Sequence, residues 1–189
     1  SYCWDGCYNC VRLDRGCNYD PFKQTTRVSK KLFAEVVKRI LGNMEIPIQV
    51  GSGFEWVLDE MSKAKNVLRI SSPWLSKDLI KNNVEPLIRR DIEVRIVTRR
   101  DLDNEEQVES LNHLSNLTKS YKNMKVKHLD SLHAKIILID NKIGIKGSMN
   151  LTFSGLYKNV EIVERYDEPE IVEKLVRDFE NIFNLANDL

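Results

Sequence analysis

Residues 133–150 decide the fold, and they read His-Ala-Lys-Ile-Ile-Leu-Ile-Asp-Asn-Lys-Ile-Gly-Ile-Lys-Gly-Ser-Met-Asn. Two apolar runs predict β-strands over residues 132–139 and 143–147, and the Asp-Asn-Lys segment between them predicts a tight hairpin turn. Alternate side chains of a strand project from the same face, so His133 and Lys135 are expected to lie side by side. The stretch therefore predicts a β-hairpin that carries an imidazole and an ammonium group on one face.

The segments on either side of this hairpin alternate between helical and extended patterns. Apolar residues recur at helical spacing over residues 54–61, 108–117 and 169–183, and a helical stretch that begins at Ser76 is expected to be interrupted at Pro86. Further strands are predicted over residues 67–73, 92–98, 126–128 and 160–164. This order predicts an α/β fold in which helices sandwich a mixed central sheet.

The hairpin residues also follow the pattern H-x-K-x4-D-x6-G-S-x-N, with every fixed position in place. A lone histidine on a strand is usually a core residue, but here a core role would also bury the ammonium group of Lys135, which is costly without a partner. A phosphate diester suits these side chains. Lys135 can place a positive charge beside its non-bridging oxygens, while Asn150 and Ser148 can donate hydrogen bonds. The pattern therefore predicts a site for a phosphodiester.

This pattern resembles the HKD motif of the phospholipase D superfamily. Residues 71–75 (Ser-Ser-Pro-Trp-Leu) and 94–97 (Val-Arg-Ile-Val) are similar to the early strands of that family, and Asn-Val-Glu at 159–161 is similar to its N-x-E element. The resemblance covers residues 50–189. It implies a phospholipase D-like fold and a phosphodiesterase activity.

The resemblance also implies roles for individual residues. His133 is expected to be the nucleophile that forms a covalent phosphohistidine, and Glu161 is expected to hold its other ring nitrogen. Asp140 is expected to anchor the hairpin rather than to act chemically. The full set of predicted catalytic-site residues is His133, Lys135, Asn150, Glu161, Ser148 and Asp140.

The chain contains one such motif, although hydrolysis through a phosphohistidine needs a second group to protonate the leaving oxygen. In this family that group is a second histidine, so two chains are expected to form a homodimer that shares one active site. No pair or cluster of carboxylates lies near the motif at metal-ligand spacing in the sequence. The predicted chemistry therefore uses no catalytic metal.

The cysteines form a separate cluster at the start of the chain. Their spacing, C-x3-C-x2-C-x6-C, suits a structural zinc ion, while an iron–sulfur cluster or two disulfides remain alternatives. The segment also resembles the cysteine-rich segment that closes some helicase-associated domains, which implies a helicase or translocase region earlier in the same polypeptide. The predicted zinc ligands are Cys3, Cys7, Cys10 and Cys17.

The composition is that of a folded protein, with 189 residues of which 42% are hydrophobic and 30% are charged. Three parts are predicted: a zinc-binding segment over residues 1–25, a connecting amphipathic helix over residues 26–49 and a catalytic domain over residues 50–189. The first residue is Ser rather than Met, which suggests a fragment of a longer protein. No apolar run approaches the roughly 18 residues of a membrane span and no secretory signal opens the chain, which favours a cytoplasmic protein without a membrane partner.

These features favour a metal-independent nuclease that cleaves DNA or RNA. One alternative is a phospholipase or cardiolipin-type hydrolase, and another is a non-catalytic nucleic-acid-binding module of a translocase. The net charge of +1 neither requires nor excludes nucleic acid. Four basic residues can either follow a nucleic-acid backbone or be ordinary solvated charges: Arg99, Arg100, Lys142 and Lys146. The remaining histidines, His113 and His128, are expected to face solvent and to have no role.

Overall fold

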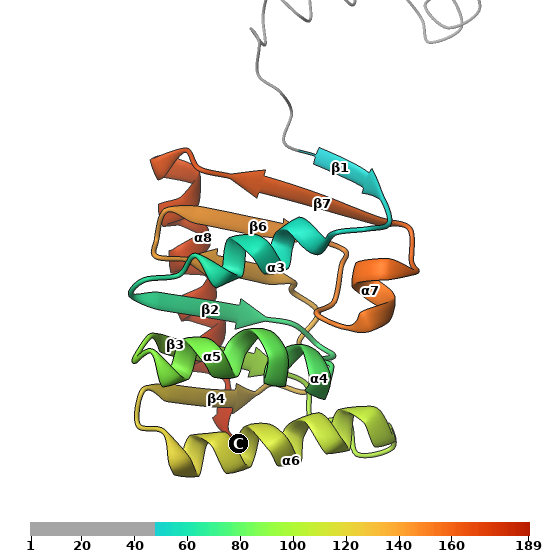
Figure 1. Cartoon of the computed structure of the whole chain (residues 1–189), viewed down its shortest axis with the longest axis vertical. Helices are drawn as coiled ribbons and strands as arrows, with labels where there is room; N and C mark the ends of the chain where they lie inside the picture. The colour runs from blue at the N-terminus through green and yellow to red at the C-terminus, as the bar shows by residue number, and fades with distance from the viewer. Residues whose placement is uncertain (1–47) are drawn as a thin grey trace, which may run out of the picture. The chain divides into compact units, whose positions relative to one another are not determined.

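The structure, a computed structural model, describes residues 48–189 (Figure 1). The predicted cysteine segment over residues 1–25 lies outside the described residues, as does nearly all of the predicted connecting helix over 26–49. The last two residues of that predicted helix belong instead to strand β1 (Ile48–Gly51). This strand is extended because it pairs antiparallel with β7 (Glu161–Tyr166) at the edge of a sheet.

Eight strands form one mixed sheet in the order β1-β7-β6-β5-β2-β3-β4-β8. Strands β2, β3 and β4 run parallel to one another, whereas every other neighbouring pair is antiparallel. The prediction of a mixed central sheet is therefore confirmed. The strands not yet given are β2 (Val67–Ser71), β3 (Glu93–Thr98), β4 (Met124–His128), β5 (Ile136–Ile139), β6 (Ile143–Gly147) and β8 (Asn187–Asp188).

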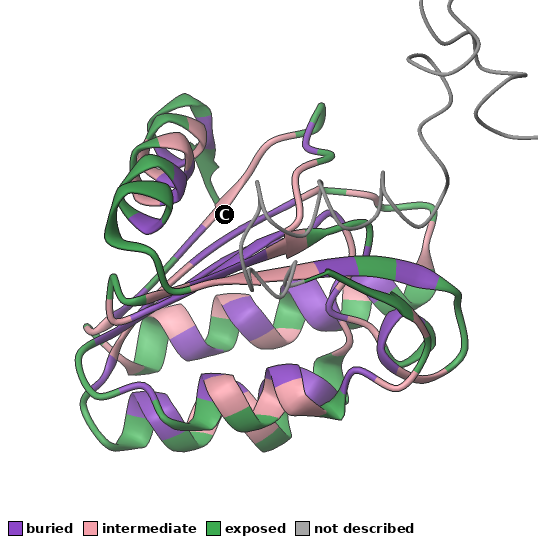
Figure 2. Ribbon diagram, turned by 90° about the horizontal axis from the view of Figure 1, so that it is seen from above, coloured by how far each residue is buried: buried purple, intermediate pink, exposed green. Residues whose placement is uncertain are grey.

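Helices cover both faces of this sheet, with their buried sides turned toward it (Figure 2). Figure 1 shows α3 (Glu55–Ser62), α5 (Glu85–Arg89) and α6 (Glu105–Ser120) in front of the sheet and α8 (Pro169–Leu185) behind it. The short helix α7 (Phe153–Tyr157) lies between β6 and β7 in the chain. Within the described residues, no helix combines the length and the hydrophobicity needed to cross a bilayer.

The helix interruption predicted at Pro86 takes the form of a π-helical turn. Helix α4 (Lys77–Leu79) continues into the π-helix η1 (Ile80–Val84), and α5 then begins with Pro86 in its first turn. Proline has no N–H to donate to the preceding turn, so the regular hydrogen-bond ladder cannot run through this position. The first turn of a new helix tolerates proline, because its N–H groups lack intrahelical partners in any case.

Strand β5 is uniformly apolar because it is covered on both faces. Ile137 and Ile139 belong to the hydrophobic cluster that includes residues of α3, η1, α5 and α6, whereas Ile136 and Leu138 pack in a second cluster with residues of α8. Side chains alternate between the faces of a strand, so a strand buried on both sides has no solvent-facing position for a polar residue.

A tight turn joins β5 to β6, as predicted. Asp140 and Asn141 both have positive φ angles, of 52° and 53°, and Lys142 N donates a hydrogen bond to Ile139 O at 2.9 Å. Two consecutive left-handed residues are typical of a type I′ turn, and Asp and Asn adopt this conformation more readily than other side chains do. The turn places Asp140 at the opposite end of β5 from His133.

Candidate active site

Five of the six predicted site residues gather at one edge of the sheet, where β2 and β6 end and where β5 and β7 begin (Figure 1), whereas Asp140 lies in the turn at the opposite edge. This follows from the antiparallel pairing of β5 with both β2 and β6, and of β7 with β6. His133 and Lys135 immediately precede β5, Ser148 and Asn150 follow β6, and Glu161 is the first residue of β7. Antiparallel topology therefore brings together residues that are well separated in the sequence.

His133 and Lys135 lie in the loop before β5, outside the strand ladder, so the prediction that this strand begins at residue 132 is wrong. The ladder between β2 and β5 ends at the pair Ser71–Ile136. Continued in the same register, the ladder would place Pro73 opposite Ala134, and proline has no N–H to donate. The hydroxyl of Ser71 donates to Ala134 O at 3.0 Å instead. A serine side chain thus holds the segment that carries the two motif residues.

The ammonium group of Lys135 turns back along its own segment. Lys135 is half-buried and its Nζ donates a hydrogen bond to His133 O at 2.7 Å, while His133 itself is exposed. Burial lowers the pKa of Lys135, and the negative charge of Glu161 partly opposes this shift. An anionic ligand would compensate for the desolvation of this ammonium group more fully than a neutral carbonyl does.

Glu161 is a buried carboxylate, with 8% of its surface exposed. Its Oε2 accepts a hydrogen bond from Ser148 Oγ, and its Oε1 accepts one from Asn159 Nδ2 at 3.1 Å. Ser148 Oγ in turn accepts from Ile162 N at 3.0 Å. Glu161 therefore bonds to Ser148 and Asn159 in place of the expected ring nitrogen of His133, because the β6–β7 pairing sets Ser148 directly beside the start of β7.

The glycine of the motif has a steric role in this pairing. Gly147 is opposite Val163 in the ladder between β6 and β7. A Cβ atom at this position would lie only 2.0 Å from the carbonyl oxygen of Ile162, so no side chain fits. The close approach of the two strands that lets Ser148 reach Glu161 therefore requires glycine here.

The loop after β6 is tied to the end of β2. Leu151 N donates a hydrogen bond to Ser72 Oγ at 3.0 Å, and Leu75 and Leu151 form an isolated parallel bridge. Asn150 precedes this bridge, and its Oδ1 is buried without a hydrogen-bond partner among residues 48–189. A buried amide oxygen without a partner is costly, so this acceptor is available to a donor such as an ordered water.

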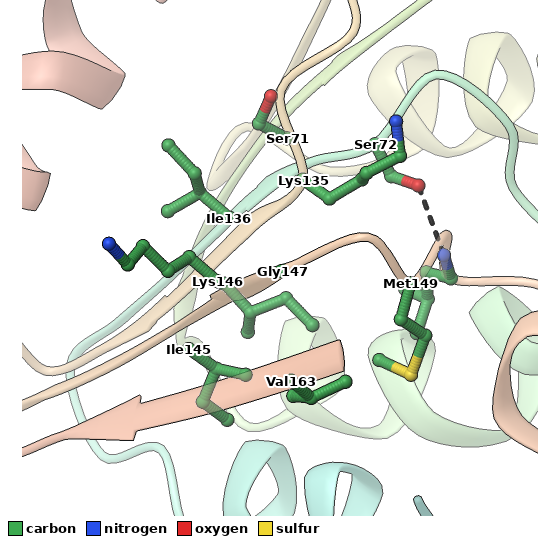
Figure 3. Close-up of a pocket in the computed structure, with 11 residues that line it drawn as sticks. Ser71, Ser72, Lys135, Ile136, Ile145, Lys146, Gly147, Met149 and Val163 are labelled. Carbon is green, nitrogen blue, oxygen red and sulfur yellow. Dashed lines mark hydrogen bonds between the residues drawn. The ribbon is translucent and has the colours of Figure 1, made fainter. Parts of the chain in front are cut away.

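A small cavity, about 10 Å³ in volume, is lined by residues at the end of β2, the start of β5 and the end of β6. In Figure 3 Lys135 and Ser72 form one side of this cavity and Met149 and Val163 form another, and a dashed line marks the hydrogen bond to Ser72 Oγ. A cavity of this size has room for no more than a single water molecule. A phosphodiester that contacts Lys135 would therefore lie across the edge of the sheet rather than enter it.

The four basic residues considered as a backbone track do not all lie at the same edge of the sheet. Arg99 and Arg100 follow β3 at the edge that carries the motif residues, whereas Lys142 lies in the turn at the opposite end of β5. Lys146 Nζ is 3.2 Å from a carboxylate oxygen of Glu164, and Figure 3 shows it pointing away from Lys135. Lys146 still lines the small cavity beside Lys135, but its charge is paired with Glu164.

Asp140 anchors the far end of the hairpin. Its carboxylate accepts hydrogen bonds from the backbone N–H groups of Lys65, Asn66 and Val67, at 2.9, 2.7 and 3.0 Å. Burial alone would raise the pKa of Asp140, but these hydrogen bonds and the charge of Lys142 lower it overall. The carboxylate thus ties the β5–β6 turn to the segment that enters β2.

The other two histidines are half-buried, so the expectation that they face solvent is wrong. His113 Nε2 lies 2.7 Å from Glu85 Oε1, and His128 Nδ1 lies 3.5 Å from Asp130 Oδ1. The contact of His113 forms because α6 packs beside the helical segment that contains Glu85. Each histidine therefore has a nearby carboxylate as its neighbour.

Metal binding remains a prediction about the cysteines. Cys3, Cys7, Cys10 and Cys17 lie outside the residues that the structure describes. Within residues 48–189, no three His, Cys, Asp or Glu side chains are grouped in a way that could hold a metal ion.

Sequence reasoning missed three polar residues that shape the site. Ser71 and Ser72 hold the segment before β5 and the loop after β6, and buried Gln107 of α6 bonds to the loop that follows β2. The two serines carried a usable signal, because hydroxyl groups placed just before Pro73 can supply hydrogen bonds that proline cannot donate. A glutamine in the first turn of a helix carries no comparable signal.

Comparisons of sequence place the chain in a known family. The family described as "Cardiolipin synthase, PLD-like domain" matches residues 57–183, which is more than half of the chain. Cardiolipin synthase 1 of Bacillus anthracis is 36% identical over 58 residues, which make up 31% of this chain and 11% of that protein. The matched stretch thus spans only a small part of the length of this relative.

Comparisons of structure show the same fold in three proteins of low sequence identity. Nuc from Salmonella typhimurium, described as a phospholipase D family member, has a TM-score of 0.63 at 23% identity, over 75% of this chain and 97% of that chain. NucT from Helicobacter pylori has a TM-score of 0.65 at 19% identity, over 75% and 97%. Phosphatidylserine synthase of Haemophilus influenzae has a TM-score of 0.57 at 14% identity, over 92% and 48%. Together with the HKD pattern at the edge of the sheet, these matches show that the chain belongs to the phospholipase D superfamily of phosphodiesterases.

Proposed function

We propose that this protein is a nuclease that cleaves DNA or RNA through a covalent phosphohistidine, without a catalytic metal. The observation that carries the proposal is the grouping of an exposed His133 with Lys135 and Asn150 at an open edge of the sheet, beside Arg99 and Arg100. A long phosphodiester backbone can lie across such an edge, and cationic side chains along its path favour a polyanion. The single HKD motif and the fold shared with Nuc and NucT also support it.

The proposed reaction has two displacement steps at phosphorus. In the first, a ring nitrogen of His133 attacks, a P–N bond forms and the P–O bond to the leaving nucleoside breaks. In the second, water attacks the same phosphorus, a P–O bond forms and the P–N bond breaks, which restores the imidazole. Lys135 and Asn150 stabilise the negative charge on the non-bridging oxygens in both steps. Glu161 keeps Ser148 in place and offsets the charge of Lys135.

The leaving oxygen needs a proton, and this requirement supports a homodimer. The proton comes from His133 of a second copy, which later accepts one from the attacking water. The exposed position of His133 in a single chain leaves its ring accessible to such a copy. The two imidazoles then share one phosphate.

The amino-terminal segment adds two further parts to the proposal. Cys3, Cys7, Cys10 and Cys17 would bind one structural zinc ion, because four thiolates in short loops suit tetrahedral coordination. A helicase or translocase region in the same polypeptide would bring this nuclease to cytoplasmic nucleic acid. Both parts rest on the sequence of residues 1–25.

A cardiolipin-type hydrolase is the second candidate function, and one observation favours it. The description of the family that matches residues 57–183 names cardiolipin synthase, and the relative from Bacillus anthracis is also a cardiolipin synthase. The chemistry at phosphorus would be the same, so the two candidates differ only in what the phosphodiester joins.

Cleavage assays with matched substrates separate these functions. The full chain is incubated in EDTA with labelled single-stranded DNA, duplex DNA, RNA and cardiolipin vesicles, and His133→Asn serves as the control. We expect nucleic acid to be cut by the wild-type chain and not by His133→Asn. Cleavage of cardiolipin alone would establish the second candidate. Activity that EDTA abolishes and that magnesium restores would refute the metal-independent mechanism.

A further inference from the structure

Two aromatic side chains in the segments that follow β2 and β6 lie outside the hydrophobic core. The first is Trp74, which is half-buried and belongs to neither of the two core clusters of the described residues. The guanidinium carbon of Arg99 lies 5.4 Å from the centroid of its ring, a typical cation–π contact. The next residue, Leu75, forms the parallel bridge with Leu151, which directly follows Asn150 of the motif. An aromatic ring and an arginine thus adjoin the motif.

Buried Gln107 holds this aromatic–arginine pair in place. Gln107 is only 1% exposed, and its Nε2 donates to Pro73 O at 3.2 Å and to Arg99 O at 2.8 Å. Its Oε1 accepts from Leu75 N at 3.1 Å. One amide therefore bonds to the residues on both sides of Trp74 and to the backbone of Arg99, so the pair is preorganised before any ligand binds.

The second aromatic is Phe153, which begins α7 just after the motif loop. It is 55% exposed and also belongs to neither core cluster. Lys158 Nζ lies 5.4 Å from the centroid of its ring, and the Tyr157 ring supports it at a centroid distance of 4.8 Å. Phe153 thus repeats the arrangement at Trp74, with an aromatic face and a neighbouring cation, three residues after Asn150 in the chain.

A pocket of about 530 Å³ adjoins Phe153, between α4, the first turns of α6 and α7. This volume is within the range of about 300–1,000 Å³ that is typical of small-molecule sites. Four carboxylate residues line it, Asp78, Glu105, Glu106 and Glu109, together with the ammonium groups of Lys77 and Lys158, so the pocket offers both hydrogen-bond acceptors and donors. A nucleobase, which is flat, uncharged and carries both donors and acceptors, suits this pocket better than an acyl chain does.

We propose that Trp74 and Phe153 are base-stacking platforms that hold the nucleosides on the two sides of the phosphodiester at His133. This inference rests on the proposed nuclease function and specifies its substrate class as single-stranded nucleic acid. Bases in a duplex are stacked on one another, whereas unpaired bases can stack on an aromatic side chain. Arg99 and Lys158 then neutralise the phosphates that flank the stacked bases.

Equilibrium binding of oligonucleotides with and without bases tests this inference. The full chain carries His133→Asn so that nothing is cleaved, and the probes are fluorescein-labelled oligothymidylate, an abasic strand of the same length and a duplex. Fluorescence anisotropy gives each dissociation constant. We expect oligothymidylate to bind more tightly than the abasic strand. Trp74→Leu and Phe153→Leu should each weaken oligothymidylate binding by roughly 5- to 150-fold, while abasic binding changes by less than about twofold.

Three further variants complete the design. Trp74→Phe and Phe153→Tyr keep an aromatic face and should retain most of the preference for bases. Ile171→Ala, at an exposed apolar residue near the start of α8 and beyond the other end of β7, removes comparable surface and should change neither binding constant. Thermal melting checks that each variant folds.

The outcomes separate this inference from the nuclease proposal. Three results would each overturn base stacking. The leucine variants could weaken binding of oligothymidylate and of the abasic strand equally, or both could leave oligothymidylate binding unchanged. The third result is tighter binding of the duplex than of the single strand. A wild-type chain that cleaves no nucleic acid would refute the nuclease proposal, while the difference between the base-bearing and abasic strands would still decide whether Trp74 and Phe153 bind bases.

Discussion

Replacing Asp140 by alanine removes the acceptor of three backbone hydrogen bonds without touching the residues around His133. Hydrogen bonds to a charged group contribute about 1.5–3 kcal/mol each. Asp140 is partly exposed, so we reduce this to about 1 kcal/mol for each bond, because solvent screens the charge. Alanine also tolerates the φ of 52° less well than aspartate, which adds about 1 kcal/mol. The expected loss of unfolding free energy is therefore about 4 kcal/mol.

Asp140→Asn separates the charge from the shape of this side chain. Asparagine accepts the left-handed conformation and keeps one acceptor oxygen, so we expect a loss of only about 1–2 kcal/mol. The pKa of Asp140 is lowered in the folded state. The extra stability of the wild type over Asp140→Asn is therefore fully present above the ordinary aspartate pKa of about 3.9. It is lost as the pH falls through the lowered folded-state pKa, because the protonated carboxyl then resembles the amide.

Urea denaturation and thermal melting, both followed by circular dichroism, measure these effects. The wild type, Asp140→Ala and Asp140→Asn are unfolded at pH 7 and at a series of acidic pH values, and the difference in free energy is plotted against pH. At pH 7 the melting temperature of Asp140→Ala should fall by roughly 10 °C. An alanine variant within about 1 kcal/mol of wild type at pH 7 would refute the anchoring role. The anchoring role would also be refuted if the difference in unfolding free energy between wild type and Asp140→Asn did not become smaller at acidic pH.

Three other predictions address the chemistry and the assembly. Lys135→Ala should lower kcat/KM on a labelled oligonucleotide by roughly 10²–10³-fold and weaken its binding, and unchanged kinetics would remove this lysine from the site. When His133→Asn and wild-type chains are mixed and re-equilibrated, activity should fall as the square of the wild-type fraction, whereas a linear fall would show that each chain works alone. Elemental analysis should find one zinc ion per chain. Removal of the zinc should leave the melting of residues 50–189 nearly unchanged. Iron with labile sulfide would overturn the zinc assignment.

The sequence alone determined the hairpin at the centre of the fold and the chemical nature of its site. The apolar run at 136–139 predicted a buried strand, and Asp140-Asn141 predicted the turn, because both depend on interactions between residues close together in the chain. The HKD pattern predicted the superfamily for the same reason, since its fixed spacings reflect one local piece of structure. The alternation of helices and strands was enough to predict helices on both faces of a mixed sheet.

Only the tertiary structure decided how these pieces meet. The strand begins at Ile136 rather than at residue 132, because the neighbouring strand ends in Ser-Ser-Pro. Glu161 bonds to Ser148 and Asn159 rather than to His133, and Gln107 reaches the loop beside the site. Each of these outcomes depends on which strands are neighbours and in which register. Register is decided by the packing of residues far apart in the chain, and local sequence patterns carry little information about such long-range contacts.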